Sequence, residues 1–442
     1  LDALPDGVLP EHGALSVTVP GAVRSWEDVG RAHGTRGFDE LLEPAERYAR
    51  EGFALTDVVA AYLALNEPVL RADAESARIF LRRGVPRAGD VFRNPELADT
   101  IAAIRRGGAD AFYAGTTGER IVTALTRRGN RMTLADLVDH RTEPTTPLRL
   151  QWHGGELVVH PPNSQAVCLL IAAGILAGDG DADEPLWAHL AVEASKDATA
   201  YRDARLCDPA FGPTGAQEAL DPARLRAARA AIDPAHAGAA VYAGNRGGTI
   251  SLNVVDENGM AVTLIESLYM NFGSGIVADG TGVVLQNRGA WFSTQPGHPN
   301  VYEGGKRPVH TLSPPMFLRD GKPEVAFGTM GGEGQPQILL QVLHNLVERG
   351  LDPQSALDAP RWVYGRSSMA GRPELDVADS VVAESRLAPD VITGLERRGH
   401  RVVTVGPYEN VMGHAHAIVI DRAKGTLAGG GDPRADSLAL GL

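Results

Sequence analysis

Residues 247–256 read GGTISLNVVD and carry the strongest fold signal in the chain. Apolar and polar residues alternate after the glycine pair, which is typical of a β-strand, so the pattern predicts a strand that begins at Thr249. A threonine in this position suits a hydrolase that processes itself. If the Gly248–Thr249 peptide is cut, Thr249 gains a free α-amino group that can act as general base for its own hydroxyl. The alternative is a threonine that merely begins a strand.

The segment that follows completes a predicted hairpin. Glu257-Asn258-Gly259 reads as a turn, and residues 260–267 read as a second strand. With a three-residue turn, Thr249 lies opposite Ser267 on the same face, within hydrogen-bonding reach. Ser267 would then orient the Thr249 hydroxyl. A two-residue Asn258-Gly259 turn shifts the register by one and separates the two side chains.

A glycine-rich turn, GTMGGEG at residues 328–334, follows a predicted strand and precedes a predicted helix with Pro336 near its first turn. Successive backbone N–H groups at such a place form an anion cradle. The turn lacks the Lys-Ser/Thr of a P-loop and the spacing of a dinucleotide fingerprint. An oxyanion hole, with two N–H donors aimed at a developing alkoxide, fits better. The alternative is a tight turn in which the glycines only provide positive φ.

Three further groups of residues are candidates for a binding site. Arg288, which lies near Trp291 in an irregular segment, either holds a carboxylate with its guanidinium fork or forms a surface ion pair. His310-Thr311 either line a site or satisfy a loop. His414 and His416 share a strand face, but no Cys, Asp or Glu cluster is evident in the nearby sequence, so we expect no metal site.

Length and composition are those of a soluble globular protein. The 442 residues allow two or three average domains or one large two-layer fold. The net charge of −13 without a basic block argues against nucleic acid and membrane surfaces as partners. The longest apolar run, residues 166–178, is too short to span a bilayer and predicts a buried helix. Cys168 and Cys207 give no disulfide framework. No signal peptide is visible, which favours the cytoplasm, although a start at Leu1 rather than Met leaves a preceding segment open.

Helical patterns dominate the first 150 residues and short β-like segments dominate after residue 249, which suggests sheets covered by helices. Helices are expected over residues 38–51, 55–70, 94–106, 116–128, 165–178, 186–200, 222–232, 336–349 and 385–398. Strands are expected over residues 148–160, 249–256, 260–267, 282–286, 324–328, 401–405 and 414–420. Residues 234–248 are rich in Gly and Ala and predict an exposed connection that is accessible to cutting.

Together these motifs resemble the gamma-glutamyltranspeptidase family of N-terminal nucleophile hydrolases over essentially the whole chain. The shared motifs are Pro20-Gly21, Tyr113-Ala114-Gly115-Thr116, Pro161-Pro162-Asn163-Ser164, residues 249–256, residues 272–277, Lys306-Arg307-Pro308, Gly331-Gly332, Ala359-Pro360-Arg361 and Asp432-Pro433-Arg434. The resemblance implies that Thr249 is the nucleophile and that the Gly331 and Gly332 N–H groups hold the oxyanion. It also implies a precursor cut at Gly248–Thr249 into a large subunit, residues 1–248, and a small subunit, residues 249–442. Together the subunits would build one α+β core of four layers, αββα, and neither a cofactor nor a metal is implied.

The substrate pocket departs from the family pattern. Ser267 stands in place of the family's second active-site threonine and keeps the hydroxyl, whereas the asparagine two residues later becomes Tyr269. The aspartate that grips a substrate ammonium aligns with Trp291. The serine pair that helps to hold a carboxylate becomes His310-Thr311. The family's carboxylate-binding arginine is expected upstream of residue 1.

These departures change the expected substrate. A free amino-acid headgroup needs an anion beside its ammonium, which Trp291 cannot supply, and the positive charge of Arg288 favours an acid. The strings NRGAWFS at residues 287–293 and TMGGEGQPQ at residues 329–337 resemble the branch that contains oxamate amidohydrolase-like and cephalosporin-acylase-like proteins.

We therefore predict a self-processing amidohydrolase that cleaves a small carboxylate-bearing amide, such as oxamate, through an acyl ester on Thr249. Two alternatives stay open. One is a glutathione hydrolase or gamma-glutamyltransferase with a modified pocket, and the other is an unprocessed, non-catalytic family member that binds or scaffolds. The expected partners are the small-molecule amide and the two subunits of one precursor, and a homodimer of processed heterodimers is a further arrangement.

Overall fold

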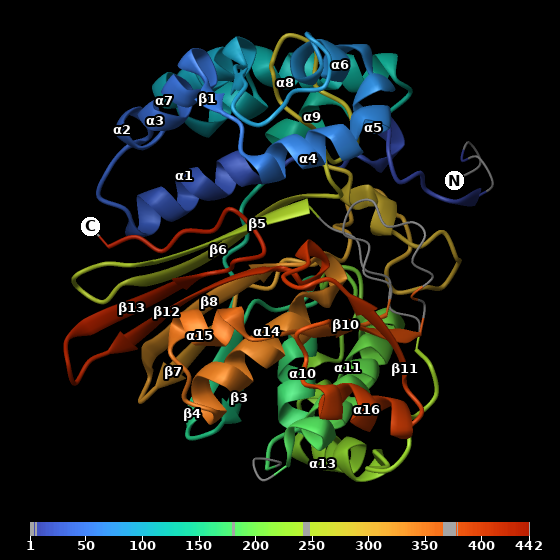
Figure 1. Cartoon of the computed structure of the whole chain (residues 1–442). Coiled ribbons are helices and arrows are strands. Elements are labelled where there is room, and N and C mark those ends of the chain that lie inside the picture. The colour runs from blue at the N-terminus through green and yellow to red at the C-terminus, as the bar shows by residue number, and fades with distance from the viewer. Residues whose placement is uncertain are drawn as a thin grey trace. The chain divides into compact units, whose positions relative to one another are not determined.

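The computed structural model describes residues 4, 7–178, 182–241, 248–365, 377 and 379–441. Helices and strands are mixed along the chain (Figure 1), which divides into two compact units. The first unit consists of residues 1–144 and 268–291, and the second of residues 145–267 and 292–442. Each of the two predicted subunits contributes residues to both units. The predicted cut at Gly248–Thr249 lies within the second unit.

The first unit is mainly helical, as its sequence pattern predicts. Its helices are α1 Ala22–His33, α2 Phe38–Leu41, α3 Glu43–Glu51, α4 Asp57–Leu65, α5 Glu67–Arg71, α6 Ala74–Phe80, α7 Pro95–Tyr113, α8 Thr116–Arg127 and α9 Leu134–Val138, with a short strand pair, β1 Phe53–Ala54 and β2 Val91–Phe92. Buried side chains of α7 and α8, among them Phe112, Ile121 and Leu125, form a core with Ile276 and Leu285. Residues 268–291 thus return to pack on these helices.

The prediction of a strand over residues 282–286 is wrong. The described chain over residues 268–291 contains an isolated bridge, Val277 to Val284, and a single 3-10 turn, Arg288–Trp291. Gly280 and Gly282 have φ angles of +70° and +68°. This left-handed conformation suits glycine and interrupts an extended strand.

A six-stranded sheet forms the centre of the second unit. Its order is β13-β12-β8-β7-β4-β3, with every neighbouring pair antiparallel. The strands are β3 Leu148–Trp152, β4 Gly155–Val159, β7 Met316–Arg319, β8 Lys322–Met330, β12 His414–Asp421 and β13 Thr426–Gly431. The continuous strand expected over residues 148–160 is wrong, because the chain reverses at His153-Gly154, where φ is +43° and +71°. Since β4 pairs with β7, both predicted subunits contribute strands to this sheet.

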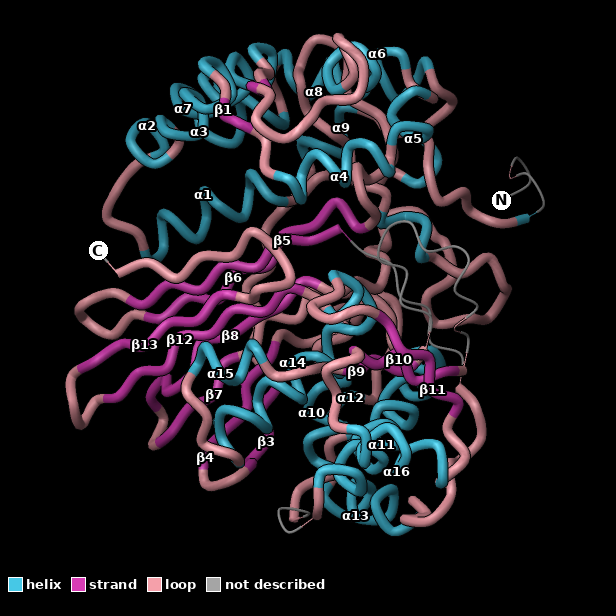
Figure 2. The backbone as a smooth tube through the Cα atoms, in the orientation of Figure 1, coloured by secondary structure: helices cyan, strands magenta, loops and turns pink. Residues whose placement is uncertain are grey.

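Opposite faces of this sheet carry helices and a second, two-stranded sheet. Gly430 of β13 shares a cross-strand row with Phe327 of β8 and lies against α15 (Pro353–Asp358), whose backbone is 2.8 Å from the position of a Cβ on Gly430. The next residue of β8, Gly328, points to the other face because side chains alternate along a strand. A Cβ on Gly328 would lie 2.3 Å from Ser251 Oγ. Ser251 belongs to β5 (Gly248–Val255), which forms a hairpin with β6 (Ala261–Tyr269); Figure 2 shows this hairpin beside the larger sheet.

Further helices belong to the second unit. They are α10 Val167–Ile175, α11 Glu184–Arg205, α12 Ala216–Ala219, α13 Pro222–Ala231, α14 Gln335–Leu343 and α16 Pro389–Arg397. Figure 1 shows α10, α14 and α15 on the side of the sheet away from the β5–β6 hairpin. The second unit therefore supplies one helical and two sheet layers. The buried helix expected over the longest apolar run is confirmed as α10, and no helix of the described residues is long and apolar enough to cross a bilayer.

A small three-stranded sheet is tied to the large one by buried charges. It contains β9 Trp362–Tyr364, β10 Ser380–Glu384 and β11 Arg401–Val405. Arg361 pairs with Asp432 at 2.6 Å, and Arg434 pairs with Glu384 at 2.5 Å. Burial raises the pKa of Asp432, but Arg361 and Arg434 outweigh it, so the net pKa lies below its ordinary value. The carboxylate therefore stays charged inside the fold.

Candidate active site

Thr249 and Ser267 face each other across the β5–β6 hairpin. The Asp256 N–H donates to the Met260 carbonyl at 3.0 Å, and Gly259 has a φ of +83°, so the turn has three residues. In the resulting register the Thr249 hydroxyl donates to Ser267 Oγ at 2.9 Å. The contact expected from a three-residue turn is thus present. Both side chains are half-buried.

The expected processing junction lies at the start of this hairpin. Gly248 is the first residue of β5 and Thr249 is the second. Residues 234–241, which lead towards it, are mostly exposed, as expected. Gly247 and the rest of residues 242–247 lie outside the described part of the chain.

The glycine-rich turn joins the end of β8 to the start of α14, as expected from the sequence. Gly331 has a φ of +155° and Gly332 a φ of +54°, both outside the range that other residues readily adopt. A Cβ on Gly331 would lie 2.6 Å from Ile338 Cδ1. The Gly334 N–H donates to the Gly331 carbonyl at 2.9 Å. In a planar trans peptide the N–H and C=O point in opposite directions, so this bond turns the Gly332 N–H away from the 3-10 turn Gly332–Gly334.

Sequence reasoning missed the buried side chains that surround this turn. Gln165, which is 0% exposed, donates from Nε2 to the Gly332 carbonyl at 3.0 Å. Arg202 donates to Gln165 Oε1 at 3.2 Å and pairs with Glu333 at 3.0 Å. The available signal was the position of Gln165 directly after the Pro161-Pro162-Asn163-Ser164 motif. Nothing local to Arg202, which lies in an ordinary helical pattern, points to the turn.

His310 and Thr311 lie beside the same glutamine. The Gln165 N–H donates to the His310 carbonyl at 2.9 Å, and the His310 N–H donates to the Asn163 carbonyl at 3.1 Å. Thr311 is completely buried, whereas His310 is half-buried. The Leu312 N–H donates to His310 Nδ1 at 3.3 Å, which assigns the proton of the neutral ring to Nε2. Of this pair, His310 is the side chain with surface to offer a ligand.

Tyr269, Arg288 and Trp291 form a cluster within the first unit. The Tyr269 and Trp291 rings are stacked, with centroids 5.8 Å apart and an interplanar angle of 10°. The Arg288 guanidinium carbon lies 3.9 Å from the Tyr269 centroid and 5.6 Å from that of Trp291. Asn287 accepts the Met270 N–H at 3.0 Å, which ties the two segments of the cluster together. The faces of the two aromatic rings thus hold the Arg288 guanidinium in this cluster.

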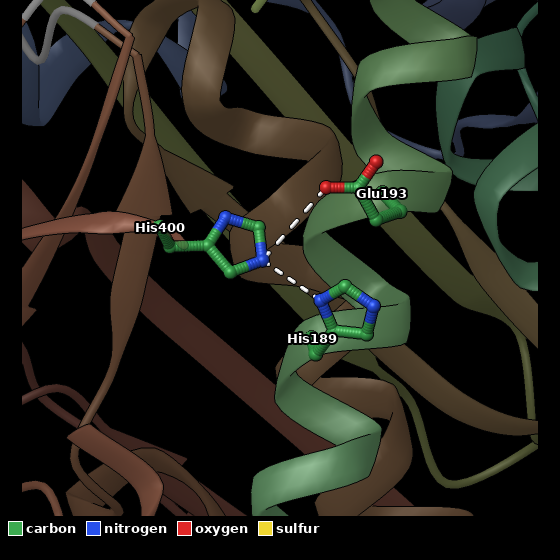
Figure 3. Close-up of side chains that lie close together, drawn as sticks. All are labelled: His189, Glu193 and His400. Atoms are coloured by element: carbon green, nitrogen blue, oxygen red, sulfur yellow. Dashed lines mark hydrogen bonds and ion pairs between the residues drawn. The ribbon is translucent and has the colours of Figure 1, made fainter. Parts of the chain in front are cut away.

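A second group of titratable side chains lies between α11 and the chain after α16. His189 Nδ1 and His400 Nε2 are 2.8 Å apart, and Glu193 Oε1 is 3.8 Å from His400 Nε2 (Figure 3). The Lys196 ammonium binds the same Glu193 oxygen at 2.7 Å. Burial lowers the pKa of both histidines, that of His400 to about 3. The facing nitrogens and Glu193 Oε1 are already engaged, and a cation here would have to displace Lys196, so we assign the cluster to packing between α11 and α16.

His414 and His416, the histidine pair considered as a metal site in the sequence, lie on one face of β12. His414 Nε2 and Asn410 Nδ2 are 2.6 Å apart, so the amide donates to the ring. Burial lowers the pKa of His414 to about 4 and also lowers that of His416. Both rings are therefore neutral near pH 7.

Comparison with known proteins now decides the family. Residues 3–442 match the family model described as Gamma-glutamyltranspeptidase. The chain belongs to this family. It is 37% identical over 446 residues to the Glutathione hydrolase-like YwrD proenzyme of Bacillus subtilis (strain 168), covering 98% of this chain and 82% of that protein. It is 36% identical, with the same coverage, to the Oxamate amidohydrolase proenzyme of Klebsiella pneumoniae subsp. pneumoniae.

Solved structures agree with the sequence comparison. The crystal structure of cephalosporin acylase from Bacillus halodurans matches with a TM-score of 0.87 at 31% identity, over 98% of this chain and 79% of that one. The mixed α+β fold of the N-terminal nucleophile hydrolases, expected from the resemblance, is therefore confirmed. Both relatives are named as proenzymes, one of a glutathione hydrolase-like protein and one of an oxamate amidohydrolase. This member of the gamma-glutamyltranspeptidase family is therefore an amide hydrolase.

Proposed function

We propose that the chain cuts itself at Gly248–Thr249 and then hydrolyses a small carboxylate-bearing amide through Thr249. One observation carries this proposal: the Thr249 hydroxyl, one residue into β5, donates to Ser267 Oγ at 2.9 Å. A nucleophile held by a neighbouring hydroxyl at a strand start is the arrangement that an N-terminal threonine hydrolase needs. The word proenzyme in the names of both relatives supports a cut precursor.

The reaction divides into acylation and deacylation. The free α-amine of Thr249 takes the proton from its own hydroxyl as Oγ bonds to the amide carbon. The N–H groups of Gly331 and Gly332 stabilise the oxyanion of the tetrahedral intermediate. When the C–N bond breaks, the α-amine returns the proton to the departing amine, which leaves an ester on Thr249. Water then adds to the ester carbon, and the acid and free Thr249 are released.

The proposed substrate carries a carboxylate next to its amide, as oxamate does. Arg288 supplies a cation, and the rings of Tyr269 and Trp291 that stack around it supply no anion for an ammonium. Tyr269 is two residues after Ser267 in β6. The Klebsiella relative named as an oxamate amidohydrolase supports the same substrate class. His310 and Thr311 are proposed as further pocket residues, with His310 offering its side chain and Thr311 its backbone.

Glutathione hydrolysis is the second candidate function. The Bacillus relative is named glutathione hydrolase-like, and a protein of Escherichia coli (strain K12) named Glutathione hydrolase proenzyme is 29% identical over 99% of this chain. In this case the pocket would bind the glutamyl ammonium without the aspartate of the family pattern. An unpaired, desolvated ammonium costs several kcal/mol, so we rank this candidate second.

Two measurements test the proposal. Intact mass under denaturing conditions should show two chains, residues 1–248 and 249–442, with Thr249 as a new N-terminus. The cut protein should then release ammonia from oxamate with a higher kcat/KM than it shows for glutathione or a γ-glutamyl anilide. An active protein that stays as one chain would contradict the threonine mechanism. Glutathione as the better substrate would replace the first candidate with the second.

A further inference from the structure

Gln165 connects the part of the chain before residue 249 to the glycine-rich turn. Its Nε2 donates to the Gly332 carbonyl at 3.0 Å and reaches the Thr311 carbonyl at 3.5 Å. Its Oε1 accepts from Arg202 at 3.2 Å. Carbonyls only accept hydrogen bonds and guanidinium groups only donate them, so these partners permit one orientation of the amide.

Arg202 keeps that orientation in place. Its side chain is buried, pairs with Glu333 at 3.0 Å and also pairs with Asp203 at 2.7 Å. Burial alone lowers the pKa of Arg202, but Glu333 and Asp203 outweigh it, so the net pKa is raised and the group is charged. A buried cation held by two carboxylates cannot turn away without leaving charges unpaired. The hydrogen bond from Arg202 therefore keeps the Gln165 amide in this orientation.

The Gly331–Gly332 turn needs stabilising contacts because glycine does not restrict the backbone to one conformation. Gly331 and Gly332 reach many φ and ψ combinations at similar cost, so contacts outside the turn must select the one observed. The Gly334 N–H holds the carbonyl of Gly331, and Gln165 holds that of Gly332. These bonds fix two successive peptide planes, which carry the N–H groups of Gly332 and Glu333. The Gly332 N–H is one of the two proposed oxyanion donors, and Gln165 holds the peptide plane that follows it.

We propose that Gln165 is a positioning residue for catalysis: it holds the Gly331–Gly332 turn in the orientation that stabilises the oxyanion formed when Thr249 attacks. This inference rests on the proposed function and adds a residue to it. Gln165 and Arg202 precede the proposed cut, whereas Gly332 and Glu333 follow it. The proposed large subunit therefore supplies side chains that contact the glycine-rich turn of the proposed small subunit.

Three variants separate positioning from stability. Gln165→Ala removes the hydrogen bonds of the amide to the Gly332 and Thr311 carbonyls and to Arg202. Gln165→Glu keeps an acceptor for Arg202 but sets an oxygen against the Gly332 carbonyl. Gln341→Ala is the matched control, because Gln341 is another buried glutamine whose Nε2 donates to two carbonyls, at 3.0 Å and 2.8 Å, between α14 and β9. Turnover of oxamate is normalised to the amount of free Thr249 α-amine, and amide exchange of residues 329–334 is followed by mass spectrometry.

Both Gln165 variants should lower kcat by roughly tenfold to a hundredfold with little change in KM, because the oxyanion exists only after attack. Exchange at residues 329–334 should become faster in both, and neither change should occur in Gln341→Ala. The inference is overturned if Gln165→Glu matches wild type in kcat and exchange, or if the control loses as much kcat. A cut, active wild type with unaffected Gln165 variants overturns this inference alone. An uncut, inert wild type overturns the proposed function and this inference together.

Discussion

Two regions of the molecule place polar side chains in different ways. One is the β5–β6 hairpin together with the Gly331–Gly332 turn, and the other is the Tyr269–Arg288–Trp291 cluster. In the hairpin the main chain sets the geometry, because a three-residue turn fixes the register that brings Thr249 to Ser267 at 2.9 Å. The Gly331–Gly332 turn has one main-chain hydrogen bond, from the Gly334 N–H to the Gly331 carbonyl, and one from the Gln165 side chain to the Gly332 carbonyl. In the cluster, side chains set the geometry: Tyr269 at the end of β6 stacks with Arg288 and Trp291 of a 3-10 turn, and the Arg288 guanidinium lies 3.9 Å from the Tyr269 ring.

The difference explains how the family pattern is kept in one region and lost in the other. Ser267 keeps the hydroxyl of the threonine in the family pattern, and the glycine pair of the turn is kept as well. A pocket made of side chains changes its ligand with each substitution, so Trp291 in place of an aspartate removes an anion outright. If the division holds, variants of the hairpin should change the rate of reaction, and variants of the Tyr269–Arg288–Trp291 cluster should change the choice of substrate.

The largest effect is expected at Thr249. Thr249→Ala should leave one uncut chain and lower oxamate turnover by about a thousandfold or more, because the nucleophile and its amine base are both lost. Thr249→Ser retains a hydroxyl and should still be cut, though more slowly. Denaturing mass spectrometry and ammonia release measure the two effects. Cutting and turnover in Thr249→Ala would move the nucleophile elsewhere.

Ser267→Ala should have the next largest effect. Loss of one hydrogen bond that aligns the nucleophile should slow cutting and turnover by roughly tenfold to a thousandfold while the fold is kept. Thr263→Val is the control, since Thr263 lies in the same strand and its hydroxyl donates to the Phe327 carbonyl rather than to Thr249. Stopped samples on a denaturing gel give the cutting rate. If both variants slow equally, Ser267 acts only through hairpin stability.

Arg288→Ala should change substrate choice rather than chemistry. A charge-assisted hydrogen bond is worth about 1.5–3 kcal/mol, so kcat/KM for oxamate should fall roughly tenfold to a hundredfold. An amide without a carboxylate should be affected much less. Arg288→Lys keeps the charge but not the planar fork, and should be intermediate. Equal losses for the charged and the uncharged amide would show that Arg288 is not a specificity residue and that the two regions do not divide these tasks.

The smallest effect concerns the scaffold of the second unit and appears as pH dependence of stability. Burial, followed by repulsion from Lys196, lowers the pKa of His400 to about 3 from 6.5. Between these values the unfolded chain binds more protons than the folded one, so the free energy of unfolding falls as the pH falls. One such histidine contributes about 1.4 kcal/mol per pH unit.

Urea unfolding between pH 6.5 and pH 5 measures this slope, and the window stays above the titration of ordinary carboxylates. His400→Gln should flatten the slope. Equal slopes in wild type and variant would show that His400 carries its proton inside the fold.

Local sequence was enough wherever neighbours along the chain decide the geometry. The segment Glu257-Asn258-Gly259 predicted a hairpin with two possible registers, of which the structure has the one with a three-residue turn. The apolar run over residues 166–178 predicted buried helix α10. The same reasoning failed at residues 148–160, since apolar alternation continues through β3 and β4 and conceals the reversal at His153-Gly154. It failed again at residues 282–286, where packing on helices replaced strand pairing.

The sequence by itself determined the family and the threonine near the start of β5, because these follow from motifs and from apolar alternation. The turn length that brings Ser267 opposite Thr249 was decided by the structure. Only the tertiary structure decided which side chain contacts the glycine-rich turn at Gly332. Gln165 and Gly332 are 167 positions apart, and no periodicity or motif spacing links residues at that separation. Their contact exists because the chain before α10 and the chain after β8 meet in one buried place, where an unpaired carbonyl or guanidinium would be costly.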